Sequence, residues 1–266
     1  MITHTEAVCD RNADSLMDKA NVVGVAGGKD ELVVFVSRKL PLDQLNPQDV
    51  VDPIVEDVET DVIEVGEVQA MLAPGDSIGL VGAGTGTYGG PVVDELGNHY
   101  LLTNNHVAAN SNKALALTEV RHPGPADGIG GRIGVLARFE PIYFDRPNYI
   151  DAALVRADAQ LAGIAKPATT TGRVGWYVQK HGRTTGHTTG EIIGRNATID
   201  VDFGDQGVAR FRNQLVTDNM LSPGDSGSVL LSRAGHPVGL SFAGSDTISL
   251  HNPINIVLRT LGVSFV

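Results

Sequence analysis

From Ala73 to near the C-terminus, the chain is divided into short apolar segments separated by glycine or asparagine. The segments are HYLLT, RIGVLARF, DAALVRA, VGWYVQK, GEIIGR, ATIDVDF, ARFRNQLV, GSVLLS and HPVGLSFA. Strands of this length, bounded by turn residues at regular spacing, are typical of an all-β sandwich or barrel. A Pro- and Thr-rich stretch, AKPATTTGR near residue 170, divides this part into two β halves.

Only the end of this part has a helical pattern, in the segment NPINIVLRTLG. We expect Asn252 as the N-cap, Pro253 at the first helical position and a stop at Gly262. The apolar face of this helix consists of Ile254, Val257, Leu258 and Leu261. The sequence therefore predicts a mainly β chain that ends in a helix.

The first 68 residues have a different pattern. Apolar or small residues recur at helical spacing at Cys9, Ala13, Leu16, Met17 and Ala20. Two strands follow, NVVGVAGG and ELVVFVSRKL, and DVIEVGEV is a third. We expect a small α+β N-terminal domain over residues 1–68, with Cys9 in its core.

Composition excludes several classes of protein. Hydrophobic residues make up 42% and charged residues 19% of the 266, and no apolar run reaches the length of a membrane span. The first fifteen residues have neither a basic region nor an apolar stretch, so we expect no signal peptide, no membrane and a cytoplasmic location. The single cysteine excludes an internal disulfide, which fits a reducing compartment.

The net charge of −11 is unevenly spread, because no Lys or Arg occurs between Lys39 and Lys113. The carboxylates of that interval include Asp43, Asp49, Asp52, Glu56, Asp57, Glu59, Asp61, Glu64 and Glu67. A solvated acidic face and a patch that attracts a basic partner both explain them. No basic stripe exists, so a nucleic-acid partner is disfavoured.

The segment LSPGDSGSVLL, residues 221–231, has the pattern of a nucleophilic serine. A serine hydroxyl needs a base within hydrogen-bond reach, and its tetrahedral product needs amide donors already in place. Gly224 leaves the backbone free to turn its N–H outward, where it joins the N–H of Ser226. Gly227 leaves room for a substrate carbonyl. The alternative is a tight turn between two strands.

His106 is the candidate base, because it follows an apolar strand in YLLTNNHVAANSN and is backed by small residues. An imidazole with an ordinary pKa of about 6.5 can take and return a proton near neutrality. Asp151 stands between Ile150 and the apolar AALV, so its carboxylate is partly buried and needs a partner. We expect that partner to be His106, and we expect Asp145 and Asp158 to lie on the surface.

The other histidines are weaker candidates. His181 and His187 flank GRTTG, yet no cysteine or clustered carboxylate completes a metal site, so we predict no metal and no cofactor. His251 lies just before the C-terminal helix, where it either caps that helix or lines a pocket.

The chain order His106, Asp151, Ser226 resembles that of the trypsin-like (chymotrypsin-fold) serine peptidases. LLTNNHV, DAAL and GDSGS are similar to the three catalytic boxes of that family. Several further segments, among them HPGPADG, VQKHGRTTGHTTGEI and PVGLSFAGS, resemble the cytosolic bacterial trypsin-like peptidases related to the plant narrow-leaf protein. This resemblance spans almost the whole chain.

The resemblance implies two antiparallel β-barrels, over residues 69–168 and 169–266, with a catalytic cleft between them. It assigns His106, Asp151 and Ser226 to a catalytic triad, and the amides of Gly224 and Ser226 to an oxyanion hole. It also puts Met220 at the base of the primary pocket, with Leu221, Phe242, Ala243 and Gly244 completing it. A pocket built from these residues favours a small or medium apolar side chain.

The predicted function is that of a serine endopeptidase whose partner is a polypeptide substrate; assembly into a homo-oligomer stays open. Two alternatives use the same fold. One is a catalytically weak or inactive trypsin-like module that acts as a binding or structural protein. The other is an esterase, because the same machinery cleaves esters.

Overall fold

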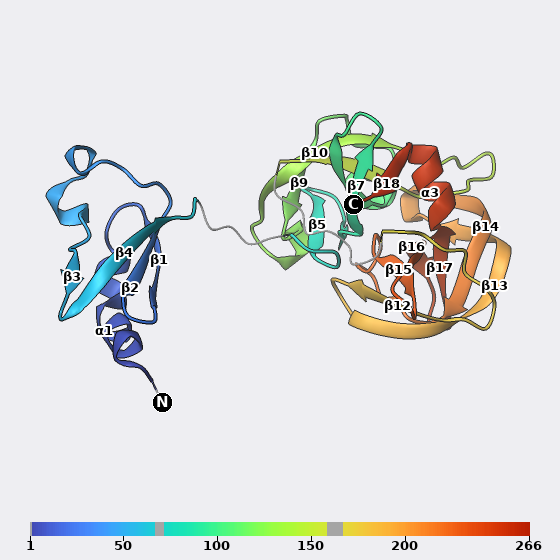
Figure 1. Ribbon diagram of the computed structural model, residues 1–266. Helices are drawn as coiled ribbons and strands as arrows, with labels where there is room; N and C mark the ends of the chain where they lie inside the picture. The colour runs from blue at the N-terminus through green and yellow to red at the C-terminus, as the bar shows by residue number, and fades with distance from the viewer. Residues whose placement is uncertain (1, 67–71, 159–166) are drawn as a thin grey trace. The chain divides into compact units, whose positions relative to one another are not determined.

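The structure is a computed structural model that describes residues 2–66, 72–158 and 167–266. Contacts between Cα atoms divide the chain into two compact units, Met1–Ala70 and Met71–Val266 (Figure 1). Each unit has a hydrophobic core of its own.

The N-terminal unit packs one helix on a four-stranded sheet. Its elements are α1 (His4–Met17), β1 (Val22–Gly27), β2 (Leu32–Val36), two short 3₁₀ turns at Leu42–Gln44 and Pro47–Asp49, β3 (Ile54–Val55) and β4 (Val58–Glu64). The strand order is β1-β2-β4-β3, and β2 runs parallel to β4. A capping box starts α1, because the Thr3 hydroxyl accepts from the amide of Glu6 while the Glu6 carboxylate accepts from the amide of Thr3.

Four residues of α1 and the sheet, Val8, Leu16, Leu32 and Val58, form the core of this unit together with Cys9. The expected helical stripe is thus only partly buried: Met17 is 45% exposed, and Ala20 lies beyond the end of α1. The expected third strand begins earlier than the pattern suggested, and its residues 67 and 68 lie outside the described residues.

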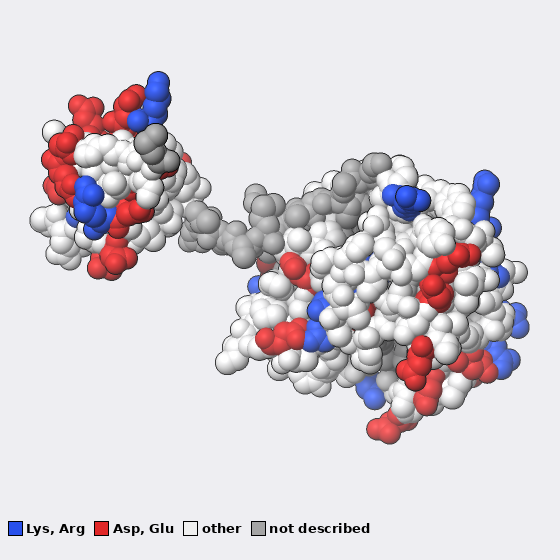
Figure 2. All heavy atoms as spheres, turned by 90° about the horizontal axis from the view of Figure 1, so that it is seen from below, with Lys and Arg blue, Asp and Glu red and all other residues white. Residues whose placement is uncertain are grey.

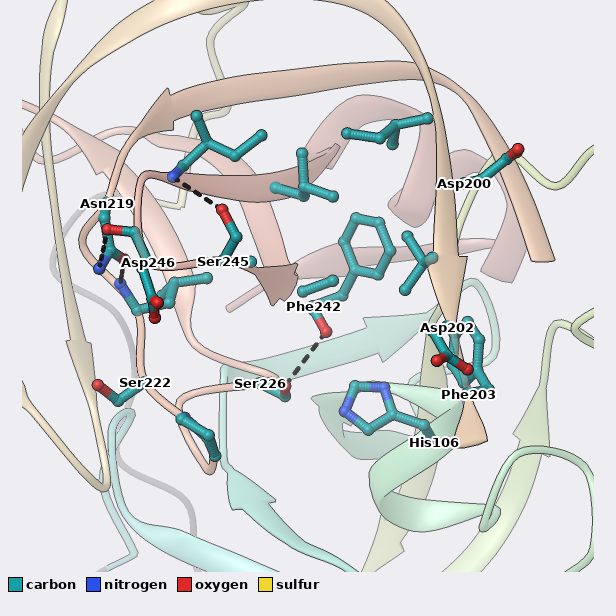
Figure 3. A pocket seen from close by; sticks show the side chains of 18 residues that line it. His106, Asp200, Asp202, Phe203, Asn219, Ser222, Ser226, Phe242, Ser245 and Asp246 are labelled. Atoms are coloured by element: carbon teal, nitrogen blue, oxygen red, sulfur yellow. Dashed lines mark hydrogen bonds between the residues drawn. The ribbon is translucent and has the colours of Figure 1, made fainter. Parts of the chain in front are cut away.

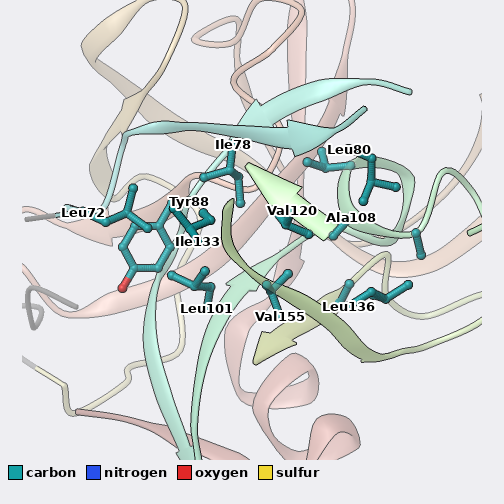
Figure 4. Close-up of a cluster of buried hydrophobic side chains, with 13 residues drawn as sticks. Leu72, Ile78, Leu80, Tyr88, Leu101, Ala108, Val120, Ile133, Leu136 and Val155 are labelled. Carbon is teal, nitrogen blue, oxygen red and sulfur yellow. The ribbon is translucent and has the colours of Figure 1, made fainter. Parts of the chain in front are cut away.

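Residues 72–158 form most of an eight-stranded antiparallel sheet. Its strands are β5 (Ser77–Leu80), β6 (Thr85–Thr87), β7 (Gly90–Asp94), β8 (His99–Thr103), β9 (Glu119–His122), β10 (Gly131–Phe139), β11 (Ala153–Ala157) and, from the C-terminus, β18 (Val263–Phe265). The order is β18-β7-β8-β11-β10-β9-β5-β6. Ile78, Leu101, Val120, Leu136 and Val155 meet in its core (Figure 4).

Residues 177–253 form a closed antiparallel barrel of six strands. These are β12 (Tyr177–Gly182), β13 (Gly186–Asp202), β14 (Val208–Asp218), β15 (Val229–Ser232), β16 (Pro237–Gly244) and β17 (Ile248–Pro253), in the order β12-β13-β14-β17-β16-β15. The helix α3 (Ile254–Leu261) follows and buries the apolar face expected of it. The remaining short helices are α2 (Asn105–Ala108), a 3₁₀ turn at Pro125–Asp127 and another at Gly204–Gln206.

The prediction of a mainly β chain is confirmed, and the described residues contain three α-helices. Two barrels were expected. The structure has one closed barrel and one sheet, and within the described residues the two end strands of that sheet, β18 and β6, do not pair with each other. None of the helices that the structure describes is long and apolar enough to cross a membrane.

Candidate active site

His106 lies in α2, a single helical turn that directly follows β8. The three residues after it, Val107, Ala108 and Ala109, are almost fully buried and anchor this turn in the core of the sheet. The imidazole itself is a quarter exposed, and its Nδ1 lies 2.5 Å from Oδ2 of Asp151. The ring is therefore held at one nitrogen while its other edge stays accessible.

Asp151 is fully buried, between Ile150 and Ala152. Its second carboxylate oxygen accepts from the backbone N–H of His106 at 3.2 Å, so the two residues are joined twice. Its own amide donates to Oδ1 of Asn252 at 3.0 Å, and its carbonyl accepts from the Asn104 side chain at 2.6 Å. Asn252 therefore supports the loop of Asp151 and is not the N-cap of α3, which begins after Pro253.

Ser226 lies in the same cleft as His106, a hollow of about 610 Å³ (Figure 3). The imidazole of His106 and the side chain of Ser226 lie beside each other there. The hydroxyl of Ser226 donates to the carbonyl oxygen of Phe242 at 3.2 Å. The backbone carbonyl of Ser226 accepts from the amide of Thr87 at 2.7 Å, which fixes the loop of Ser226 against the eight-stranded sheet.

Two peptide carbonyls in the loop before Ser226 accept hydrogen bonds. The carbonyl of Pro223 accepts from the Thr184 hydroxyl at 2.8 Å, and that of Asp225 accepts from the amide of Ser228 at 3.0 Å. In a trans peptide the N–H points away from the carbonyl. Each of the amides of Gly224 and Ser226 therefore points away from the bonded carbonyl of its own peptide, and Gly224 adopts a φ of 101° that suits glycine.

A buried ion pair between Lys180 and Asp225 anchors the loop before Ser226. Nζ of Lys180 lies 3.1 Å from Oδ2 of Asp225, and both side chains are completely buried. Burial lowers the pKa of Lys180, although the nearby Asp225 opposes that shift. Burial would raise the pKa of Asp225, but hydrogen bonds from Ser222, Thr185 and Lys180 together outweigh it and lower that pKa. The carboxylate is therefore ionised and tied to several donors.

A second buried polar network lies in the barrel. The imidazole of His251 is fully buried in β17, with Nε2 3.1 Å from the Thr217 hydroxyl and Nδ1 3.0 Å from that of Ser241. Thr217 donates its proton to the carbonyl of Asp218, so it accepts from Nε2–H of His251. Burial, and less strongly the charge of Lys180, lower the pKa of His251 to about 3. His251 is thus a neutral core residue and neither caps α3 nor lines the cleft.

Four of the five predicted pocket residues line the cleft: Leu221, Phe242, Ala243 and Gly244. The fifth, Met220, is 4% exposed and packs in the barrel core, where its amide donates to the Ser249 hydroxyl. The sequence patterns did not indicate the polar residues of this wall, which are Asn219, Ser222, Ser245 and Asp246. They also did not indicate the contribution of β13, which lines the cleft with Ile199, Asp200, Val201, Asp202 and, just beyond its end, Phe203.

His187 contacts the Gln179 side chain at 3.0 Å, and the His181 ring packs on Gly75. In the part of the chain that the structure describes, no three His, Cys, Asp or Glu side chains are grouped to hold a metal ion. Asp145 and Asp158 are exposed, and Asp158 pairs with Arg132 at 2.7 Å.

No protein-family model and no curated protein matches this sequence. Solved structures do match. Nocardiopsis protease (NAPase) shares 22% identity with a TM-score of 0.56, and Thermobifida fusca protease A shares 20% with the same score. Cellulomonas bogoriensis chymotrypsin shares 20% with a TM-score of 0.54. Each match covers 74% of this chain and 99% of the other. The chain thus shares the fold of the chymotrypsin-fold serine proteases.

Proposed function

We propose that this protein is a serine endopeptidase that cleaves peptide bonds through an acyl-enzyme intermediate. The observation that carries the proposal is that His106, which is joined to the buried Asp151 at 2.5 Å, lines one cleft with Ser226. The shared fold supports it, and so does the order of the three residues in the sequence. We further propose, from the sequence motifs, that its relatives are the cytosolic bacterial peptidases related to the plant narrow-leaf protein.

In this mechanism the hydroxyl oxygen of Ser226 attacks the substrate carbonyl carbon, and Nε2 of His106 takes the hydroxyl proton. The buried Asp151 keeps Nδ1 protonated and stabilises the imidazolium that forms. His106 then gives its proton to the leaving amine as the C–N bond breaks, which leaves an ester on Ser226. A water molecule, activated by the same imidazole, hydrolyses this ester.

The oxyanion of each tetrahedral intermediate is negatively charged and needs donors fixed in advance. We assign this role to the amides of Gly224 and Ser226, and the assignment is supported by the fact that each points away from the bonded carbonyl of its own peptide. Losing one such donor costs about 3 kcal/mol of transition-state stabilisation. The loop does not need to rearrange, since Lys180 and Asp225 already hold it.

The Ser226 hydroxyl must leave the carbonyl of Phe242 before it can donate to His106. Rotation of the Ser226 side chain redirects this proton, and side-chain rotations are fast compared with turnover. A substrate peptide whose N–H occupies the Phe242 carbonyl favours this rotation, because it removes the competing acceptor.

The proposal is tested with a fluorophosphonate probe on wild type, Ser226→Ala and Ser228→Ala. Ser228 is a matched control, since it is a serine of the same loop, fully buried and outside the cleft lining. We expect wild type and Ser228→Ala to be labelled and Ser226→Ala to stay unlabelled. A wild-type protein that stays unlabelled while a control peptidase reacts contradicts the proposal and favours a non-catalytic binding module.

Casein and a small ester separate peptidase from esterase. We expect casein to be cut, with turnover falling on the order of 10⁴- to 10⁶-fold in Ser226→Ala. Hydrolysis of the ester with intact casein assigns the site to ester substrates instead.

A further inference from the structure

The part of the cleft beside His106 is built by the hairpin of β13 and β14. Five consecutive residues, 199–203, line it there, at the end of a strand 17 residues long. The ring of Phe203 meets the imidazole of His106 edge to face, with 6.3 Å between centroids, and stacks on Phe211 at 6.1 Å. Phe144 adds a further edge contact to Phe203 at 6.0 Å. Phe203 is thus a fixed aromatic wall next to the imidazole.

An unpaired carboxylate lies next to this wall. Asp202 is exposed, and one of its oxygens accepts from the amide of Gly204 at 2.8 Å, which orients the group. No Lys or Arg forms an ion pair with Asp202 among the described residues. The neighbouring Asp200 differs, because both its oxygens are bonded to Arg210 at 2.7 and 2.8 Å. Asp202 and Phe203 both lie beside His106 (Figure 3).

The charge of the whole cleft is negative. Three carboxylates line it, and among the described residues no Lys or Arg does. Asp202 is the unpaired carboxylate at the end next to His106, whereas Asp246 lies at the other end beside Asn219 (Figure 3). The subsite next to His106 therefore combines an aromatic face with a free negative charge.

An extended peptide places successive side chains on opposite sides of its backbone. If the side chain of the residue directly before the cleaved bond packs against Leu221, Phe242 and Ala243, the side chain of the preceding residue turns toward His106 and Phe203. A guanidinium can stack on an aromatic face and bind a carboxylate through its planar fork. Its aliphatic stem can cover apolar surface at the same time.

We propose that the second residue before the cleaved bond is basic, with arginine preferred, and that Phe203 and Asp202 select it. This inference rests on the proposed peptidase function and adds a substrate class to it. Asp202 and Phe203 are specificity residues in this account. His106 and Ser226 perform the chemistry.

The test uses the full-length protein and three peptides that differ only at that position, which holds Arg, Gln or norleucine. We expect kcat/KM to favour Arg over Gln roughly tenfold at low salt, the range of a cation–π contact joined to an exposed ion pair. Raising the salt concentration shrinks this ratio. Asp202→Asn, which keeps an acceptor for Gly204, lowers it to about twofold. Phe203→Leu lowers the preference for Arg over norleucine.

Asp205→Asn is the matched control, because Asp205 lies at the tip of the same hairpin, is exposed and does not line the cleft. We expect it to keep the wild-type ratio. An Arg to Gln ratio of kcat/KM near one in the wild type overturns the inference. It is also overturned if Asp205→Asn lowers this ratio as much as Asp202→Asn does, because the preference would then come from the general negative charge of the region and not from contact with Asp202. Failure of the peptidase proposal looks different, since then no peptide is cleaved and Ser226 is not labelled.

Discussion

At the scale of single residues, the proposed mechanism requires Asp151 to determine which nitrogen of His106 acts as the base. Its carboxylate accepts at Nδ1, so the lone pair of the imidazole is at Nε2. In Asp151→Asn the amide group donates to Nδ1, which moves the ring proton to Nε2 and removes the base. We expect kcat on a peptide substrate to fall about 10⁴-fold with the fold retained, as checked by circular dichroism.

Asp158→Asn removes the same charge from an exposed position, where Asp158 pairs only with Arg132. We expect its kcat to stay within about twofold of wild type, as is usual for surface charges. Nearly full activity in Asp151→Asn is the result that contradicts the assigned role.

His251 makes stability depend on pH. Burial lowers its folded-state pKa to about 3, whereas the unfolded chain has an ordinary histidine pKa of about 6.5. Between these two pH values only the unfolded state binds the proton. The contribution of His251 to the free energy of unfolding is therefore fully present above about pH 6.5 and is lost as the pH falls toward 3. The free energy of unfolding then drops by about 1.4 kcal/mol per pH unit from this group.

The measurement is urea unfolding at pH 6.5 and 4.5 for wild type and His251→Gln. Between pH 6.5 and 4.5 we expect the free energy of unfolding of the variant to fall by roughly 2 kcal/mol less than that of wild type, whatever the stability of the variant at pH 6.5. Equal losses in the two proteins rule out His251 as the titrating group.

At the scale of elements, the loop of Ser226 is closely packed at Gly227. Gly227 has a φ of 99°, and a Cβ there would lie 2.1 Å from the carbonyl oxygen of Thr87. Gly175 has a similar φ of 86°, yet a Cβ there would meet nothing within 4 Å. We expect Gly175→Ala to cost about 1 kcal/mol of unfolding free energy through strain alone. Gly227→Ala should cost roughly 3 kcal/mol or more, since it adds a clash with backbone.

Urea unfolding of both variants checks this difference, and turnover of the folded Gly227→Ala protein gives a second readout. Equal losses of stability in the two variants would mean that β6 moves to make room for the added methyl group, and that its contact with Gly227 does not fix the loop.

Sequence patterns could predict residues whose role is visible within a few neighbours. His106 follows an apolar strand, Asp151 is flanked by apolar residues, and Ser226 lies in a glycine-rich loop. Lys180 and Thr87 have no such local signal, because their partners in the loop lie 45 and 137 residues away. The role of such residues can be identified only from the folded structure, in which their distant partners lie next to them.

The single strand β13 shows a similar limit. Its pattern predicts two strands, GEIIGR and ATIDVDF, broken near Asn196. Asn196 does adopt a positive φ of 53°, but the pairing with β14 continues past it with a shifted register. A turn residue can thus mark a bulge, and the bulged strand extends far enough to bring Phe203 to the cleft.

At the scale of the whole molecule, the acidic character belongs mainly to one unit. Residues 1–70 contain 15 Asp and Glu but five Lys and Arg, whereas residues 71–266 contain 16 and 15. Red carboxylate side chains cover much of the N-terminal unit on the face shown in Figure 2. The N-terminal unit therefore carries −10 of the net charge of −11, and the unit with the candidate site carries −1 and has a negative cleft.

The two units also differ in the size of their cores, and this leads to the last prediction. The N-terminal core is centred on Val8, Leu16, Leu32 and Val58, all within a segment of 70 residues, and units of that size are only marginally stable. The rest of the chain has several larger clusters. We expect calorimetry of the full-length protein to resolve two transitions, and Leu32→Ala to lower only the first by several degrees. A single transition that Leu32→Ala shifts as a whole would show instead that the units unfold cooperatively.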